Sequence, residues 1–113
     1  MANVATGHQA EAAVAANLEG RGYKILGLNW KTKLCEIDVI ARKDKIVYFV
    51  EVKYRAASGQ GSGFEYITPK KLSQMQFAAR LWNQTNDWDG DYRLLGAEVS
   101  GLDFEIIDLV EID

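Results

Sequence analysis

Two segments of the chain carry apolar residues at helical spacing. The first is rich in alanine and runs from Thr6 to about Leu18, and Thr6 and Gln9 have the spacing of a capping box. The second opens with Thr68 as a predicted N-cap and Pro69 at the first helical position. Its apolar positions then recur every three or four residues: Leu72, Met75, Ala79 and Trp82. We predict a helix over each segment.

Five other segments are rich in β-branched and aromatic residues and predict strands. They cover residues 23–29, 36–41, 46–54, 92–99 and 104–112. In the third, both alternating sets are apolar, with Phe49 on one face and Val50 on the other, so we expect both faces to be covered and the strand to be central. Residues 55–66 hold three glycines and two serines and predict a loop. The order αβββαββ indicates an α/β fold with a mixed sheet of about five strands flanked by helices.

The size and composition of the chain indicate one domain over residues 1–113, of which 48% are hydrophobic. The single Cys35 cannot form an intrachain disulfide, and one cysteine with one histidine cannot supply a structural zinc site. This composition favours a reducing, cytoplasmic location. Neither a signal peptide nor a membrane span is predicted.

The net charge of −3, from 16 acidic and 13 basic residues, argues against a nucleic-acid binder held by bulk positive charge. Any DNA contact must therefore be local. Carboxylates that bind a divalent cation would also make the net charge of the metal-free chain negative. The net charge therefore does not decide between a metal-dependent nuclease and a protein that does not bind nucleic acid.

Two charged residues interrupt the apolar third strand. Glu51 and Lys53 are two residues apart, so their side chains leave the same face of the strand. Burying a charge in a central strand costs several kcal/mol unless the charge is paired or bound to a metal. An ordinary surface ion pair is the alternative interpretation of an acid and a lysine at this spacing.

Asp38 lies on the preceding strand, and its distance from Glu51 depends on the hairpin register. If Asp44 and Lys45 are the turn residues, Asp38 faces Glu51 directly, with Cβ atoms about 4.5–5.5 Å apart. A turn at residues 43–44 would instead place Phe49 opposite Asp38. In the first register, Asp38 and Glu51 could hold Mg²⁺, for which Mn²⁺ could substitute, while Lys53 steadies the attacking water or the charge that grows on a phosphate.

Basic residues outside this group form a candidate DNA-facing patch. Lys70 and Lys71 fall in the first turn of the second helix, where the helix dipole disfavours cations and a bound phosphate would remove the conflict. Two solvated lysines are the alternative. Together with Arg55, Lys31, Lys33 and Arg42 they are the candidate DNA-facing residues. Gln74 or Gln76 could reach the site from the same helix, and a polar flank of that helix is the alternative.

Several short motifs carry a resemblance to a known family. They are Gly7-His-Gln-Ala-Glu11, Gly22-Tyr23, Asn29, Glu36-Ile-Asp-Val-Ile-Ala41, Tyr48-Phe-Val-Glu-Val-Lys53 with Arg55, and Ala78-Ala79. To about residue 82 the chain resembles the bacterial YraN/UPF0102 family, which is similar to archaeal Holliday junction resolvases and belongs with the PD-(D/E)XK, or restriction-endonuclease-like, nucleases. Cys35 and Ala10 stand where that family usually has glycine.

The resemblance implies a restriction-endonuclease-like fold, a divalent metal, a DNA substrate and an active site of Glu11, Asp38, Glu51 and Lys53, with the three carboxylates as metal ligands. For Glu11 the alternative is a solvated residue that the helix dipole favours. The leading functional hypothesis is a Mg²⁺-dependent endonuclease acting on DNA, branched DNA included. The alternatives are an inactive nucleic-acid- or protein-binding module on the same fold, and a homodimeric structural protein. A homodimer is compatible with all three.

Overall fold

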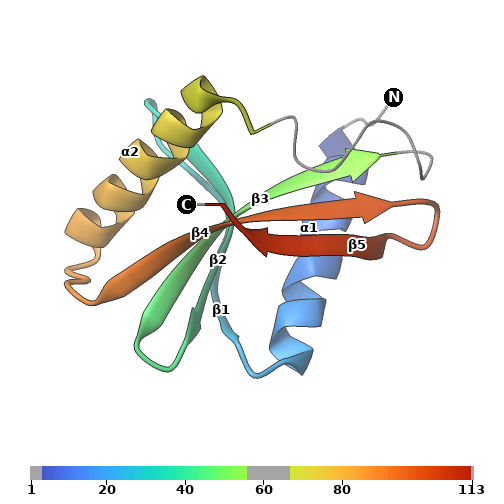
Figure 1. The fold of residues 1–113 in the computed structure, drawn as a ribbon, viewed down its shortest axis with the longest axis horizontal. Coiled ribbons are helices and arrows are strands. Elements are labelled where there is room, and N and C mark those ends of the chain that lie inside the picture. The colour runs from blue at the N-terminus through green and yellow to red at the C-terminus, as the bar shows by residue number, and fades with distance from the viewer. Residues whose placement is uncertain (1–3, 56–66, 113) are drawn as a thin grey trace.

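The structure of the protein is a computed structural model that describes residues 4–55 and 67–112. Its elements follow one another as α1 (Val4–Gly20), β1 (Lys24–Lys31), β2 (Glu36–Lys43), β3 (Ile46–Arg55), α2 (Pro69–Thr85), β4 (Asp91–Ser100) and β5 (Glu105–Glu111), as Figure 1 shows. The predicted order αβββαββ is therefore confirmed.

The five strands form one sheet in the order β1-β2-β3-β4-β5. β3 and β4 are parallel and joined through α2, whereas the other neighbouring pairs are antiparallel. A parallel pair needs such a crossover connection, and a helix is the usual one. The sheet is mixed, as predicted, and β3 is its middle strand.

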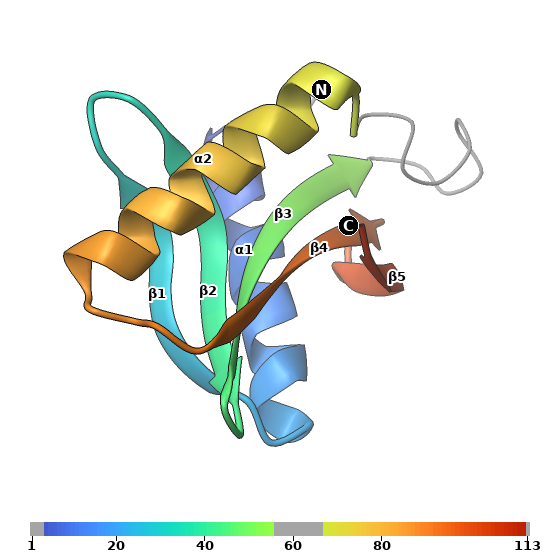
Figure 2. The same cartoon turned by 60° about the vertical axis from the view of Figure 1, so that its left-hand side comes forward.

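The two helices lie on opposite faces of the sheet (Figures 1 and 2). Under α1, the buried core includes Val14, Leu18, Val39, Val50 and Ala97. Under α2, it includes Val47, Phe49, Met75, Trp82 and Leu94, and the rings of Phe49 and Trp82 meet edge to face with centroids 5.6 Å apart. Successive residues of β3 thus alternate between two cores, which confirms that both of its faces are covered.

Several element boundaries differ from the prediction, those of α1 and β1 among them. α1 begins at Val4, so Thr6 lies inside the helix and the predicted capping box is wrong. β1 continues two residues past Asn29, which adopts a φ of 52° within the strand. Asparagine tolerates this left-handed conformation better than most residues, so it does not end the strand here. Of the predicted loop, residues 56–66 lie outside the described residues. Within the described parts of the chain, no helix is long and apolar enough to cross a membrane.

The N-terminus of α2 forms as the sequence predicts. Thr68 is the N-cap, and its hydroxyl accepts a hydrogen bond of 3.1 Å from the backbone N–H of Lys71. Pro69 occupies the first turn, where it has no hydrogen bond to lose. The cap fixes the turn that carries Lys70 and Lys71.

Replacing the cap tests this element. Thr68→Ala leaves the Lys71 N–H without its partner and should lower the free energy of unfolding by about 1 kcal/mol. Urea denaturation measures the change. Thr85→Ala, at the exposed far end of α2, is the matched control and should change stability by less than about 0.5 kcal/mol. Equal losses in the two variants would contradict the capping role.

Candidate metal and nucleic-acid site

The face of β3 that packs under α2 changes from apolar to charged toward the end of the strand. Val47 and Phe49 are buried there, and Glu51 follows on the same face. Its side chain is only 17% exposed, and its Oε2 lies 2.9 Å from Nζ of Lys71 on α2. Lys53 is exposed, and within the described residues it is Lys71, not Lys53, that pairs with Glu51. The surface-pair interpretation of Glu51 with Lys53 is therefore wrong.

The hairpin between β2 and β3 has the register that places Asp38 near Glu51. Pairing runs from Lys43 opposite Ile46 to Val39 opposite Val50, so the turn is at Asp44-Lys45 and the preferred register is confirmed. Asp44 adopts a φ of 55°, a conformation that aspartate tolerates better than most residues. One further step of the same register would bring Asp38 opposite Glu51.

The backbone pairing of β2 with β3 ends at Val39 and Val50, before Asp38. Beyond that point, the Asp38 side chain binds the backbone of β3. Oδ2 of Asp38 accepts a hydrogen bond of 2.8 Å from the backbone N–H of Val52. The carboxylate thus lies against β3 next to Glu51 rather than extending into solvent. This contact holds Asp38 in position, because it also satisfies a strand N–H that the ladder no longer pairs.

Glu11 on α1 completes a group of three carboxylates. It is 9% exposed, and its Oε1 is buried without a hydrogen-bond partner. Burial raises the pKa of Glu11, whereas hydrogen bonding with Asp38 and then with Asn29 lowers it. The interpretation of Glu11 as a solvated helix residue is therefore wrong. His8, one turn earlier, is exposed.

Burial and the charges of neighbouring acids make Asp38 and Glu51 hard to ionise. Burial is the main cause that raises the pKa of Asp38 to about 7; the Val52 N–H opposes it, and the charge of Glu11 adds to it. Burial also raises the pKa of Glu51 to about 7, with repulsion from Asp38 as the next cause and the contact with Lys71 opposing both. Paired acids in low dielectric commonly behave in this way. A cation at this point would remove the conflict.

Lys71 supplies part of that compensation. Burial alone would lower the pKa of its ammonium, but the hydrogen bond to Glu51 and the charges of Glu51 and Asp38 outweigh burial and raise it. One ammonium cannot neutralise three carboxylates. Negative charge therefore remains in excess when all three are ionised.

The donor set fits a hard divalent cation by its chemistry. Carboxylate oxygens are the ligands that Mg²⁺ and Mn²⁺ prefer, and the buried Oε1 of Glu11 has no other partner. Across the described residues, no three His, Cys, Asp or Glu side chains stand close enough together to enclose an ion as they lie. Binding therefore requires side-chain rotation, and Glu51 would have to exchange Lys71 for the ion.

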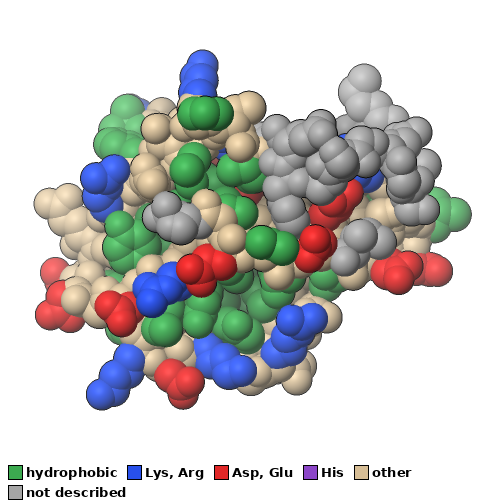
Figure 3. Space-filling view, in the orientation of Figure 1, with side chains coloured by type: hydrophobic (Ala, Val, Ile, Leu, Met, Phe, Trp, Pro, Cys, Tyr) green, Lys and Arg blue, Asp and Glu red, His purple; other side chains and the backbone are tan. Residues whose placement is uncertain are grey.

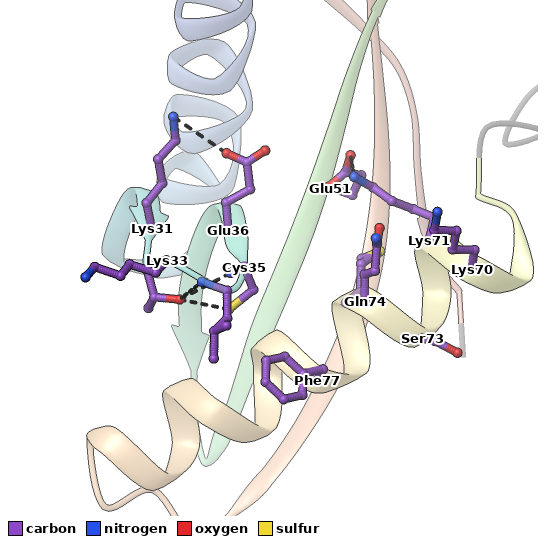
Figure 4. A pocket seen from close by; sticks show the side chains of 13 residues that line it. Lys31, Lys33, Cys35, Glu36, Glu51, Lys70, Lys71, Ser73, Gln74 and Phe77 are labelled. Atoms are coloured by element: carbon purple, nitrogen blue, oxygen red, sulfur yellow. Dashed lines mark hydrogen bonds and ion pairs between the residues drawn. The ribbon is translucent and has the colours of Figure 1, made fainter.

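A cleft of about 620 Å³ opens beside this group, with Glu51 in its lining. Residues 31–36, which join β1 to β2, form one wall, and residues 70–77 of α2 form the other (Figure 4). Of the candidate DNA-facing residues, four line the cleft: Lys31, Lys33, Lys70 and Lys71. Gln74 lines it as well, whereas Gln76 and Arg42 do not. Arg55 does not; its Nε lies 2.7 Å from Oε2 of the buried Glu98 on β4.

Two contributors to the site were not predicted as such. Lys71 is a predicted DNA-facing residue, and in the structure it also forms an ion pair with Glu51 of the site. Asn29, which is one position of the family motif, is among the groups that lower the pKa of Glu11. The sequence gives little sign of a role for Asn29 in the site, because an asparagine at the end of a predicted strand is equally typical of an ordinary turn.

A family model described as Uncharacterised protein family UPF0102 matches residues 10–112. The chain belongs to the UPF0102 family. The UPF0102 protein of Cytophaga hutchinsonii is 35% identical over 101 residues, which cover 89% of both proteins. That of Oleidesulfovibrio alaskensis is 42% identical over 89 residues, 78% of this chain but 44% of the relative, so the chain spans less than half the length of that relative. That of Leifsonia xyli is 43% identical over 86 residues, 76% of this chain and 68% of the relative.

The family match confirms the UPF0102 part of the resemblance that the sequence motifs carry. It spans all three carboxylates, the hairpin that places Asp38, and both walls of the cleft. The names of these UPF0102 relatives state membership and no activity.

The raised pKa values give the metal-free protein a testable pH dependence. Asp38 and Glu51 have ordinary pKa values of 3.8 and 4.5, which the fold raises to about 7. Between these limits the folded state binds more protons than the unfolded state, so the two groups favour folding at low pH, and that contribution is lost as pH rises through about 7. Without divalent metal, wild type should lose on the order of 1–2 kcal/mol more between pH 5 and pH 8 than Asp38→Asn does.

Urea denaturation across that pH range in EDTA measures the difference. Asp44→Asn, an exposed turn substitution of the same chemistry, is the control and should follow wild type. Parallel curves for wild type and Asp38→Asn would show that the fold does not raise the pKa of Asp38 as described.

Proposed function

We propose that this protein is a Mg²⁺-dependent endonuclease that hydrolyses phosphodiester bonds in DNA, branched DNA included, and that Mn²⁺ can replace Mg²⁺. The observation that carries the proposal is the convergence of Glu11, Asp38 and Glu51 from α1, β2 and β3 beside a cleft lined by lysines. A buried group of like charges is costly unless a counter-charge binds there. Perturbed acids at the edge of a cleft are typical of functional sites. The resemblance to restriction-endonuclease-like nucleases points to the same chemistry.

The metal would be held by Asp38 and Glu51, with Glu11 as a third oxygen donor. A divalent cation in such a site supplies a Lewis acid for a phosphoryl oxygen and lowers the pKa of the attacking water. Asp38 is already held by the Val52 N–H, so one of its oxygens has a fixed position. The other carboxylate oxygen of Asp38 and the carboxylate of Glu11 would then turn toward the metal.

Two lysines have distinct proposed roles. Lys53 follows Glu51 on the same strand face and is exposed, so a substrate phosphate can reach it, and it would stabilise charge growing on that phosphate. Lys71 stands at the N-terminal turn of α2, where backbone N–H groups also favour anions. It would bind the phosphate once Glu51 no longer holds it.

One observation favours the alternative of a binding module without turnover. The ion pair of Glu51 with Lys71 neutralises that acid without a metal, as a DNA- or protein-binding descendant of the fold would require. The two functions differ in whether the carboxylates bind a divalent cation.

Calorimetric titration of Mg²⁺ and Mn²⁺, with cleavage of a labelled four-way junction and a linear duplex alongside, separates the two functions. Wild type should bind metal and cut. Asp38→Asn should lose metal binding and at least about 100-fold of the cleavage rate, because the metal supplies several kcal/mol of transition-state stabilisation. Asp44→Asn should match wild type. Wild type that binds neither metal, even with DNA present, contradicts the enzymatic function and favours the binding module.

Substituting the lysines one at a time should separate their roles, because only Lys71 competes with the metal for Glu51. Lys71→Met removes the cation that competes for Glu51, so it should tighten Mn²⁺ binding several-fold while weakening DNA binding. Lys53→Met should leave the metal affinity unchanged and lower the cleavage rate at saturating metal and DNA. Lys45→Met, at the exposed β2–β3 turn and outside the cleft, is the control for charge alone. Weaker Mn²⁺ binding in Lys71→Met would contradict the competition.

A further inference from the structure

We propose that the cleft between α2 and the β1–β2 connection binds an unpaired segment of DNA, with a base stacked on Phe77 and phosphates held by lysines of both walls. The inference rests on the proposed function and specifies its substrate: DNA with a single-stranded stretch, such as a flap, a frayed end or the opened centre of a branch. Four features of the cleft carry it.

The size of the cleft suits one strand. Its volume of about 620 Å³ falls within the range of about 300–1,000 Å³ that ligand pockets of small molecules have. A space of this volume cannot enclose a double helix, whose major groove alone is about 12 Å wide and 8.5 Å deep. A strand of two or three nucleotides matches this space.

The charge of the cleft differs in sign from that of the whole chain. Its lining has four lysines, Lys31, Lys33, Lys70 and Lys71, against two glutamates, Glu36 and Glu51, a local excess of two positive charges in a chain of net charge −3. Elsewhere, basic and acidic side chains are interspersed, as the face in Figure 3 shows. The Lys31–Glu36 pair is 3.7 Å apart and well exposed, so a phosphate can displace it at little cost. The positive charge is thus placed for an anionic strand in the cleft.

Phe77 supplies a stacking surface in a polar stripe of α2. Its side chain is 46% exposed, whereas Trp82 on the same helix is buried in the core. Figure 4 shows its ring on the cleft side of α2, directed toward the β1–β2 connection. Lys70, Gln74 and Phe77 follow at spacings of four and three residues, so they share one stripe about 10 Å long. A basic groove with an exposed aromatic side chain is the usual arrangement for single-stranded nucleic acid.

The opposite wall and the floor agree with this assignment. Leu34, at the tip of the β1–β2 connection, is 75% exposed, which gives the second wall an apolar contact for a base or sugar. Glu51 lies in the lining between the walls. A strand that stacks on Phe77 therefore runs past the carboxylate group, where its backbone would be cut.

The test is fluorescence anisotropy in EDTA with three labelled probes: a single-stranded 20-mer, the blunt duplex of the same sequence, and that duplex with a single-stranded flap. Wild type should bind the single strand and the flap at least 10-fold more tightly than the blunt duplex. Phe77→Ser should weaken binding of the single strand and the flap about 5- to 50-fold, in the range measured for the loss of a base–aromatic stack, and leave duplex binding unchanged. Phe77→Tyr should restore the affinity.

Leu102→Ser removes an apolar side chain that is 94% exposed between β4 and β5, far along the chain from the cleft, and is the matched control. Equal affinity of wild type for single strand and duplex overturns the proposal. Unchanged binding by Phe77→Ser, or an equal loss of single-strand and duplex binding, also overturns it. A changed oligomeric state of Phe77→Ser by light scattering, with intact DNA binding, overturns it as well, because Phe77 would then belong to a protein interface.

Binding in EDTA separates this inference from the proposed function. Wild type in EDTA should bind the single strand without cutting it, so this affinity is measured independently of metal-dependent cleavage. Preserved stacking without metal-dependent cleavage would refute the endonuclease and leave the strand-binding cleft. Cleavage with no preference for unpaired DNA would refute the cleft and leave the endonuclease.

Discussion

The structure depends on β3, which pairs with a strand on each side and packs against a helix on each face. A strand enclosed in this way can carry charge only where a partner neutralises it, because an ionised carboxylate loses several kcal/mol of solvation on burial. Along β3 the apolar side chains continue through Phe49 and Val50, and Glu51 is the first charged residue. Its raised pKa and its contact with Lys71 of α2 are two consequences of the same enclosure.

The point where β2 and β3 stop pairing determines how the site is assembled. Beyond Val39 and Val50 the ladder ends, and Asp38 uses its carboxylate to bind a backbone N–H of β3. Residues 31–36, which connect β1 to β2, do not pair with β3 and form one wall of the cleft, with α2 as the other wall. Glu11 reaches the same point from the opposite face of the sheet, through α1. The carboxylates and the lysine-lined cleft are thus consequences of one interruption in the sheet.

Much of this arrangement could be predicted from the sequence, because local rules determine it. The Thr68-Pro69 pair determines where α2 begins, and the turn at Asp44 determines the register of the hairpin. Burial of Glu11 also has a signal, since Glu11, Val14 and Leu18 lie three and four residues apart and share the apolar stripe of α1. The pairing of Lys71 with Glu51 has none, because it depends on how α2 crosses the sheet after residues 56–66, and no spacing in the sequence specifies that crossing. The start of α1 was missed because a capping pattern can also occur inside a helix.

The central claim is that Asp38 and Glu51, with Glu11, form a site for a divalent cation. Anomalous diffraction from a crystal of the wild-type protein soaked in Mn²⁺ tests it most directly. The account predicts one strong peak within about 2.0–2.6 Å of oxygens from Asp38 and Glu51, with the Lys71 ammonium moved away from Glu51. No peak at these carboxylates, with the ion pair of Lys71 and Glu51 intact at saturating Mn²⁺, would contradict it.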